Sequence, residues 1–218
     1  MTSLWILLSV AAASPTPLVA LGDALLAPDS PAPERAPGWV SVLADCLSER
    51  SPGSFEVLDR TTRGMTAASA REAVPAARAL GPELVVVGLG AQELSRAEGA
   101  GGAFRQAVGE LLGVLREEPA APVVMLVGLV PPSVAQLPAV APSTRAVLDE
   151  RAVAWNGVLF DLAAEEEAVH HVDLLADWPV AVEGRHRLTR GGLHLSDRGH
   201  ARVAAQVCDA VLALRPSP

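Results

Sequence analysis

The stretch Leu18-Val19-Ala20-Leu21-Gly22-Asp23-Ala24-Leu25 decides the fold. Its first four residues form an uninterrupted apolar run that stops at a Gly-Asp pair, as a short buried strand does where it meets a turn. Continuous apolar runs are typical of strands that are covered on both faces, as in a parallel sheet flanked by helices. The stretch therefore predicts a central first strand that ends at Gly22 and Asp23.

Runs of the same kind recur along the chain and alternate with helical patterns, which predicts an α/β fold with right-handed crossovers. Further strands are predicted at Phe55–Leu58, Leu84–Leu89, Val123–Val130 and Val172–Leu174, and helices at Trp39–Arg50, Ala67–Leu80, Phe104–Glu118, Ser143–Glu167 and Ser196–Leu214. Ligands of such sheets bind outside the carboxyl ends of the strands. We therefore expect Asp23, Gly64 and the Gly90-Ala91-Gln92 segment to converge on one crevice.

The length of 218 residues suits one domain, predicted at residues 18–215, after an N-terminal extension or signal peptide at residues 1–17. Half of the residues are hydrophobic (50%) and 19% are charged, which excludes a disordered chain. The 17 basic and 25 acidic residues give a net charge of −8. That sign opposes binding to phosphates, so no nucleic-acid partner is expected.

The apolar segment Leu4–Ala13 is too short to cross a bilayer, so no integral membrane segment is expected. Small residues follow it, as in a signal peptide, but no positive charge precedes it. Two locations stay open: periplasmic or secreted if the segment is a signal peptide, and cytoplasmic otherwise. Cys46 and Cys208 lie far apart in the sequence, and we expect free thiols rather than a bridge.

Four short blocks in this order resemble those of the SGNH (GDSL) hydrolases. They are Gly22-Asp23-Ala24-Leu25, Gly64, Gly90-Ala91-Gln92-Glu93 and Gly192-Leu193-His194. The resemblance implies a flavodoxin-like three-layer sandwich with a parallel five-stranded sheet. It also implies hydrolysis of esters, thioesters, lysophospholipids or sugar acetates, without a cofactor.

The catalytic positions of that family are only partly kept in this chain. The resemblance places Ala24 where the family has its nucleophilic serine, and Gly191 where it has the aspartate of the triad. His194 corresponds to the general base, whose tautomer the aspartate normally fixes. The chain therefore resembles an SGNH hydrolase that lacks two of three triad members.

The same resemblance assigns an oxyanion hole to the backbone N–H groups of Ala24 and Gly64 and to the side-chain amide of Gln92. Gln92 is one methylene longer than the asparagine of the family. Asp23 is expected to shape the turn by accepting backbone hydrogen bonds. Loss of a triad serine costs on the order of 10⁶ in turnover, so whether this chain is an enzyme is left open.

Three functions are compatible with these residues. The favoured one is a catalytically impaired protein that keeps a crevice for a small acyl or acetyl ester. The alternatives are a slow esterase or lysophospholipase-like hydrolase that uses His194, and a non-catalytic scaffold that binds a partner. The oligomeric state is not predicted.

Several other polar residues have both a functional and a purely structural interpretation. Ser196 is expected to cap the last helix, and Ser30 is a remote candidate nucleophile. Arg185 and its neighbours Arg187 and Arg190 either receive an anionic ligand or are simply solvated. Trp178 either covers the core or stacks on a substrate.

The remaining aromatic and titratable residues favour structural interpretations. Trp39 is expected to pack the first helix on the sheet, and Trp155 to cover an edge of the core. No metal site is expected, because no pair of histidines has a helical metal-binding spacing. His170 and His171 are interpreted as the solvated end of a helix before the last strand.

Overall fold

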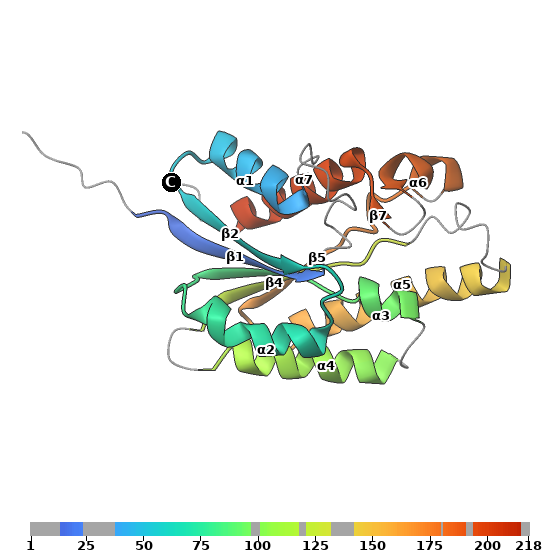
Figure 1. The fold of residues 1–218 in the computed structure, drawn as a ribbon, viewed down its shortest axis with the longest axis horizontal. Helices are drawn as coiled ribbons and strands as arrows, with labels where there is room; N and C mark the ends of the chain where they lie inside the picture. The colour runs from blue at the N-terminus through green and yellow to red at the C-terminus, as the bar shows by residue number, and fades with distance from the viewer. Residues whose placement is uncertain are drawn as a thin grey trace, which may run out of the picture.

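A parallel five-stranded sheet forms the middle of the molecule (Figure 1). The computed structural model describes residues 14–23, 38–96, 101–117, 121–131, 142–179, 181–190 and 194–214. The strands are β1 Thr16–Asp23, β2 Phe55–Thr62, β3 Leu84–Gly88, β4 Val123–Val127 and β5 Val169–Val172, in the order β2-β1-β3-β4-β5. Every pairing between neighbours in this sheet is parallel, which confirms the predicted fold class.

Helices cover both faces of the sheet and complete a three-layer sandwich (Figure 1). They are α1 Trp39–Arg50, α2 Ala67–Arg78, α3 Ala91–Arg96, α4 Gly101–Leu115, α5 Pro142–Ala164, α6 Val182–Leu188 and α7 Asp197–Ala213. Helices α1 and α7 pack together on one face, and α2, α4 and α5 pack side by side on the other. None of the helices in the described part of the chain has both the length and the apolar character that crossing a bilayer requires.

The first strand contributes to two hydrophobic cores at once. Leu18 and Ala20 belong to the core under α1 and α7, whereas Val19 and Leu21 belong to the core under α2, α4 and α5. All four side chains are fully buried. Burial on both faces is the physical reason why this strand reads as a continuous apolar run.

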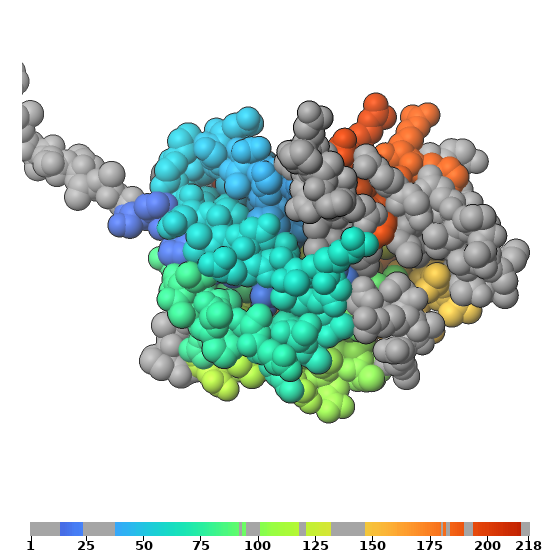
Figure 2. All heavy atoms as spheres, viewed as in Figure 1, coloured from blue at the N-terminus to red at the C-terminus, as the bar shows by residue number. Residues whose placement is uncertain are grey.

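Strand β2 is the edge of the sheet next to β1, and many of its side chains are exposed. Figure 2 shows residues 39–78, which form α1, β2 and α2, as one continuous surface on this side of the molecule. This edge of the sheet is therefore flanked by a helix on each face.

Trp39 and Trp155 lie in different cores. Trp39 is buried in the core under α1 and α7, as predicted. Trp155 stacks on Phe104 with ring centroids 4.4 Å apart and is buried inside the other core. The expectation that Trp155 covers an edge of the core is therefore wrong.

The fifth strand of the sheet, β5, begins earlier than predicted. In the register of β5, His170 pairs with Met125 and His171 with Leu126, both in β4. The interpretation of the two histidines as a solvated helix end is wrong, because α5 already ends at Ala164. Pairing with an apolar neighbouring strand determines the structure here, against the polar character of the two residues.

Three short features were not predicted from the sequence. They are α3, α6 and a small antiparallel ribbon of β6 Thr189–Arg190 and β7 His194–Leu195. Each spans only a few residues, which is too short for a periodic pattern to develop.

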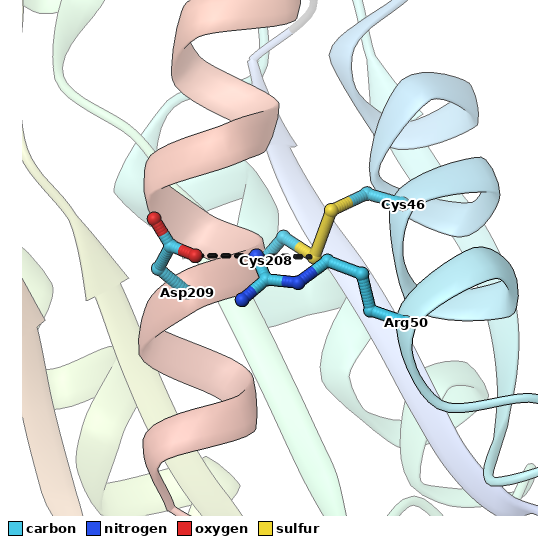
Figure 3. Close-up of a disulfide and its surroundings, with 4 residues drawn as sticks. All are labelled: Cys46, Arg50, Cys208 and Asp209. Atoms are coloured by element: carbon cyan, nitrogen blue, oxygen red, sulfur yellow. Dashed lines mark hydrogen bonds and ion pairs between the residues drawn. A yellow bond between two sulfur atoms is a disulfide. The ribbon is translucent and has the colours of Figure 1, made fainter.

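A disulfide links α1 to α7 (Figure 3). Cys46 and Cys208 are 162 residues apart in sequence, but the packing of the two helices brings their Cα atoms to 6.4 Å. The expectation of free thiols is therefore wrong. Sequence separation gave no sign of this contact, which depends on the tertiary packing of two helices.

We expect the Cys46→Ser, Cys208→Ser double variant to be less stable than the wild type by about 2–5 kcal/mol, because a bridge across a long loop restricts the unfolded chain. Chemical denaturation with a linear extrapolation measures the difference. Reduction of the wild type is the matched control and should give a similar loss. Equal denaturation midpoints for oxidised wild type and double variant would contradict the prediction.

Candidate active site

One hydrogen bond joins the carboxyl ends of β1 and β2. The backbone N–H of Gly64 donates to Asp23 Oδ1 at 2.9 Å. Asp23 is the last residue of β1 and is 1% exposed, while Gly64 follows β2 with a φ of +78°, which favours glycine. The first two sequence blocks therefore meet at one edge of the sheet, where the strand pattern predicts the crevice.

The sequence does not predict Gly64 as the donor of this hydrogen bond. Asp23 was expected to accept bonds within its own turn, but Gly64 lies 41 residues further along the chain. The carboxyl group of Asp23 thus connects two strands.

The carboxyl ends of β1 and β3 approach each other closely because glycines lie opposite one another. Gly22 pairs with Gly88, and its φ of +147° is one that L side chains rarely adopt. A Cβ atom on Gly22 would overlap the carbonyl oxygen of Gly88. Only a glycine at this position allows the end of β1 to lie so close to the end of β3.

A second carboxylate ties the third block to the second. Glu93 Oε1, in α3, accepts a hydrogen bond of 2.8 Å from the backbone N–H of Ala67, the first residue of α2. The first N–H groups of a helix have no partner within the helix, so this bond satisfies one of them. This contact of Glu93 is not predicted from the sequence, although a charged residue just after a buried strand is a signal for this edge of the sheet.

The Asp23 contact bears on the assigned oxyanion hole. Gly64 N–H already has an acceptor, so an oxyanion would have to displace Asp23 Oδ1 to use this donor. An ionised Asp23 would in addition repel the developing negative charge. This geometry opposes oxyanion stabilisation at Gly64.

Several of the assigned residues lie outside the described part of the chain. Ala24 and Gly191 do so entirely, and Gln92 is described only through its backbone in α3. Their convergence on a common point stays a prediction.

His194, the residue assigned as the base, lies in the short ribbon and not in the main sheet. It pairs with Arg190 and is half-buried. Figure 1 shows β7 and α6 beyond the carboxyl ends of the strands, on the same side as α3. His194 is therefore placed on the side of the molecule where the blocks meet.

The hydroxyl of Ser196 is used to cap a helix. Its Oγ accepts from Gly199 N–H at 3.2 Å and donates to the carbonyl of Arg187 at 2.7 Å. Ser196 is the N-cap of α7, which confirms that prediction. The other candidate hydroxyl, Ser30, lies outside the described residues.

Arg185 has a structural role. Its Nη1 lies 2.8 Å from Asp149 Oδ2 in α5, and its Nε donates to the carbonyl of Pro179 at 3.0 Å. The guanidinium therefore holds α6 to α5, which favours the structural interpretation of Arg185. Trp178 is buried in the core under α1 and α7, which favours its interpretation as a core residue over substrate stacking.

Asn156 of α5 is a buried polar residue that sequence analysis missed. Its Oδ1 accepts from Leu129 N–H, and its Nδ2 donates to the carbonyls of Leu129 and Ala152, each at 2.8 Å. These bonds fix the chain just beyond β4, on the edge where the other blocks meet. A single asparagine among the apolar residues of a helix was the available signal, because a buried amide needs specific partners.

A hollow of about 370 Å³ lies at the opposite edge of the sheet. It is lined by Arg78, Gly81, Pro82, Glu83, Ala121, Pro122 and Val123, near the amino ends of β3 and β4. The guanidinium of Arg78 donates to the carbonyls of Val114 and Glu117, so it has a structural role. The sequence blocks do not contribute to this hollow, and we do not place the active site there.

The described residues also contain no group of three or more His, Cys, Asp or Glu side chains that could hold a metal ion.

The chain belongs to the GDSL-like lipase/acylhydrolase family, whose model matches residues 20–202. No curated protein sequence matches this chain significantly. The family membership agrees with the order of the blocks and with the parallel sheet.

Solved structures of this family have the same fold. The chain is similar to the crystal structure of TesA, with 21% identity, a TM-score of 0.69 and coverage of 92% of this chain and 100% of TesA. A lipase/acylhydrolase from Enterococcus faecalis has 18% identity and a TM-score of 0.69, with 93% and 99% covered. A carbohydrate acetylesterase family member from Sinorhizobium meliloti has 17% identity and a TM-score of 0.68, with 91% and 98% covered.

We expect the Asp23→Ala variant to lose about 1–3 kcal/mol of stability, because the N–H of Gly64 loses its acceptor in a part-buried position. Asp23→Asn keeps an acceptor oxygen and should lose less, which makes it the matched control. Thermal and chemical denaturation of the two variants measure the difference. Equal stability of Asp23→Ala and the wild type would show that the bond does not hold the two strands together.

Burial lowers the pKa of His171 below its usual value of 6.5, and the charge of Asp173 offsets part of this effect. The folded state therefore favours the neutral ring, so stability should fall as the pH drops below about 6.5. Unfolding measured from pH 7.5 to 5 should show a weaker dependence in His171→Gln than in the wild type. His170→Gln, which leaves His171 in place, is the matched control. The same dependence in His171→Gln and the wild type would contradict this assignment.

Proposed function

We propose that this chain is a catalytically impaired member of its family whose crevice binds an acyl- or acetyl-bearing ligand without efficient turnover. The proposal is carried by Ala24, which the Gly22-Asp23-Ala24-Leu25 block aligns with the family's serine. A methyl group cannot attack an ester carbonyl. Loss of a triad nucleophile costs on the order of 10⁶ in turnover.

Two further features support the proposal. Gly191 has no carboxylate to fix the tautomer of His194, so the base lacks its usual orienting partner. The N–H of Gly64 is bonded to Asp23, which opposes its use as an oxyanion donor. The nucleophile, the base and the oxyanion hole are thus each affected by a separate feature.

The related structures support the proposed ligand class. Their descriptions as a lipase/acylhydrolase and as a carbohydrate acetylesterase family member concern enzymes of acyl and acetyl esters. We transfer only the acyl or acetyl group to this chain. The alcohol part of the ligand is left open.

The decisive experiment restores the triad. We expect the Ala24→Ser, Gly191→Asp double variant to hydrolyse a short-chain p-nitrophenyl ester at least about 10²-fold faster than the wild type, a small part of what a complete triad contributes. The double variant should also react with a fluorophosphonate at the hydroxyl introduced by Ala24→Ser. Each single variant is a control and should stay close to the wild type.

Control variants separate the alternative functions. The addition of His194→Ala to the double variant should abolish the gain. Wild-type turnover that disappears in His194→Ala would overturn the proposal in favour of a slow hydrolase, and so would fluorophosphonate labelling of a wild-type serine. A flat thermal-shift response to acyl and acetyl ligands would instead favour a scaffold.

A further inference from the structure

The two sulfurs of the bridge between α1 and α7 have different surroundings. Cys208 is fully buried in the core under these helices, whereas Cys46 is only partly buried. Cys46 is therefore the more accessible residue of the pair for a thiol reagent that approaches from solvent. Accessibility is one of the factors that decide which sulfur of a disulfide is attacked.

The positive charge of Arg50 lies close to the sulfur of Cys208. Arg50 lies one helical turn after Cys46 on α1, and its Nη1 is 3.9 Å from Cys208 Sγ. The same nitrogen forms an ion pair with Asp209, the residue after Cys208 (Figure 3). A guanidinium beside a sulfur stabilises the thiolate, and a stabilised thiolate is the better leaving group.

We propose that the Cys46–Cys208 bridge is a site of directional thiol–disulfide exchange with a dithiol–disulfide oxidoreductase. Cys46 is the sulfur attacked, and Cys208 is the leaving thiolate, held by Arg50. This inference is independent of the ligand proposed for the crevice.

The exchange balances in two steps. A thiolate of the reduced partner attacks Cys46 Sγ, forms a mixed disulfide with it and releases the electron pair of the broken bond on Cys208 as a thiolate. The second thiolate of the partner then attacks the partner's first sulfur, which is bonded to Cys46 in the mixed disulfide. This attack closes the partner's disulfide and releases Cys46 as a thiolate. The partner is oxidised to its disulfide by two electrons, and the bridge is reduced to two thiols.

The reverse sequence forms the bridge from an oxidised partner. The thiolate of Cys46 first makes the mixed disulfide, and the thiolate of Cys208 resolves it. The bridge is attached to α7, which follows the β7 residue His194 and has Ser196 as its N-cap. Reduction therefore removes the covalent link between α1 and the helix that follows the proposed base, while the packing of the two helices remains.

Trapping in the wild type tests which sulfur exchanges. The oxidised protein is exposed briefly to reduced glutathione and quenched with acid, and peptide mass mapping locates the glutathione. We expect it on Cys46. Glutathione on Cys208, or equally on both cysteines, would overturn the proposal without the use of any variant.

Two variants of the ion pair test the role of Arg50. Arg50→Gln removes the charge next to Cys208, and Asp209→Asn removes the same ion pair but keeps that charge. We expect reduction by dithiothreitol to slow by about threefold or more in Arg50→Gln, and to stay the same or become faster in Asp209→Asn. Arg71→Gln, which breaks a comparable surface ion pair with Glu110, is the control and should match the wild type.

The pair of variants separates chemistry from packing. Equal changes in Arg50→Gln and Asp209→Asn would show that only the ion pair matters and would overturn the role of Arg50. Faster reduction in Arg50→Gln would do the same, because local opening would then control the rate. Circular dichroism before reduction establishes that each variant is folded.

Discussion

The architecture of the candidate site depends on how the end of β1 meets its two neighbours. β1 lies between β2 and β3, so its last residues contact both strands. Asp23 accepts a hydrogen bond from Gly64 after β2, and Gly22 lies directly against Gly88 of β3. The Gly22-Asp23 dipeptide thus positions the end of β1 against both of its neighbours, through a carboxyl acceptor on one side and the absence of a side chain on the other.

The layers of the fold could be predicted because they depend on local patterns. The apolar run at Leu18 to Leu21 indicates burial on both faces, and the structure places alternate residues in two cores. β5 was misplaced because two histidines fall within it. The ring of His171 makes an edge contact with Phe160 on α5, and this contact depends on the packing of α5 against the sheet.

The candidate site was less predictable than the fold. Sequence blocks located Asp23 and Gly64 on one edge of the sheet, but their hydrogen bond depends on the register of two strands. The contacts of Glu93 with Ala67 and of Asn156 with Leu129 also join separate elements. Periodicity reports the environment of a residue within its own element, so such partners become visible only when the elements are packed.

The same contacts also bear on the proposal that this crevice lacks its nucleophile. Asp23, Glu93 and Asn156 all bind backbone groups, so the shape of this edge does not depend on a catalytic serine. Under the proposed loss of catalysis, a hydroxyl at position 24 alone would not complete the site, because Gly64 N–H already donates to Asp23. If Gly64 N–H is an oxyanion donor, the free energy of releasing it from Asp23 adds to the barrier for ester attack. Stabilisation of the oxyanion therefore decides, together with the nucleophile, how much activity a restored triad can reach.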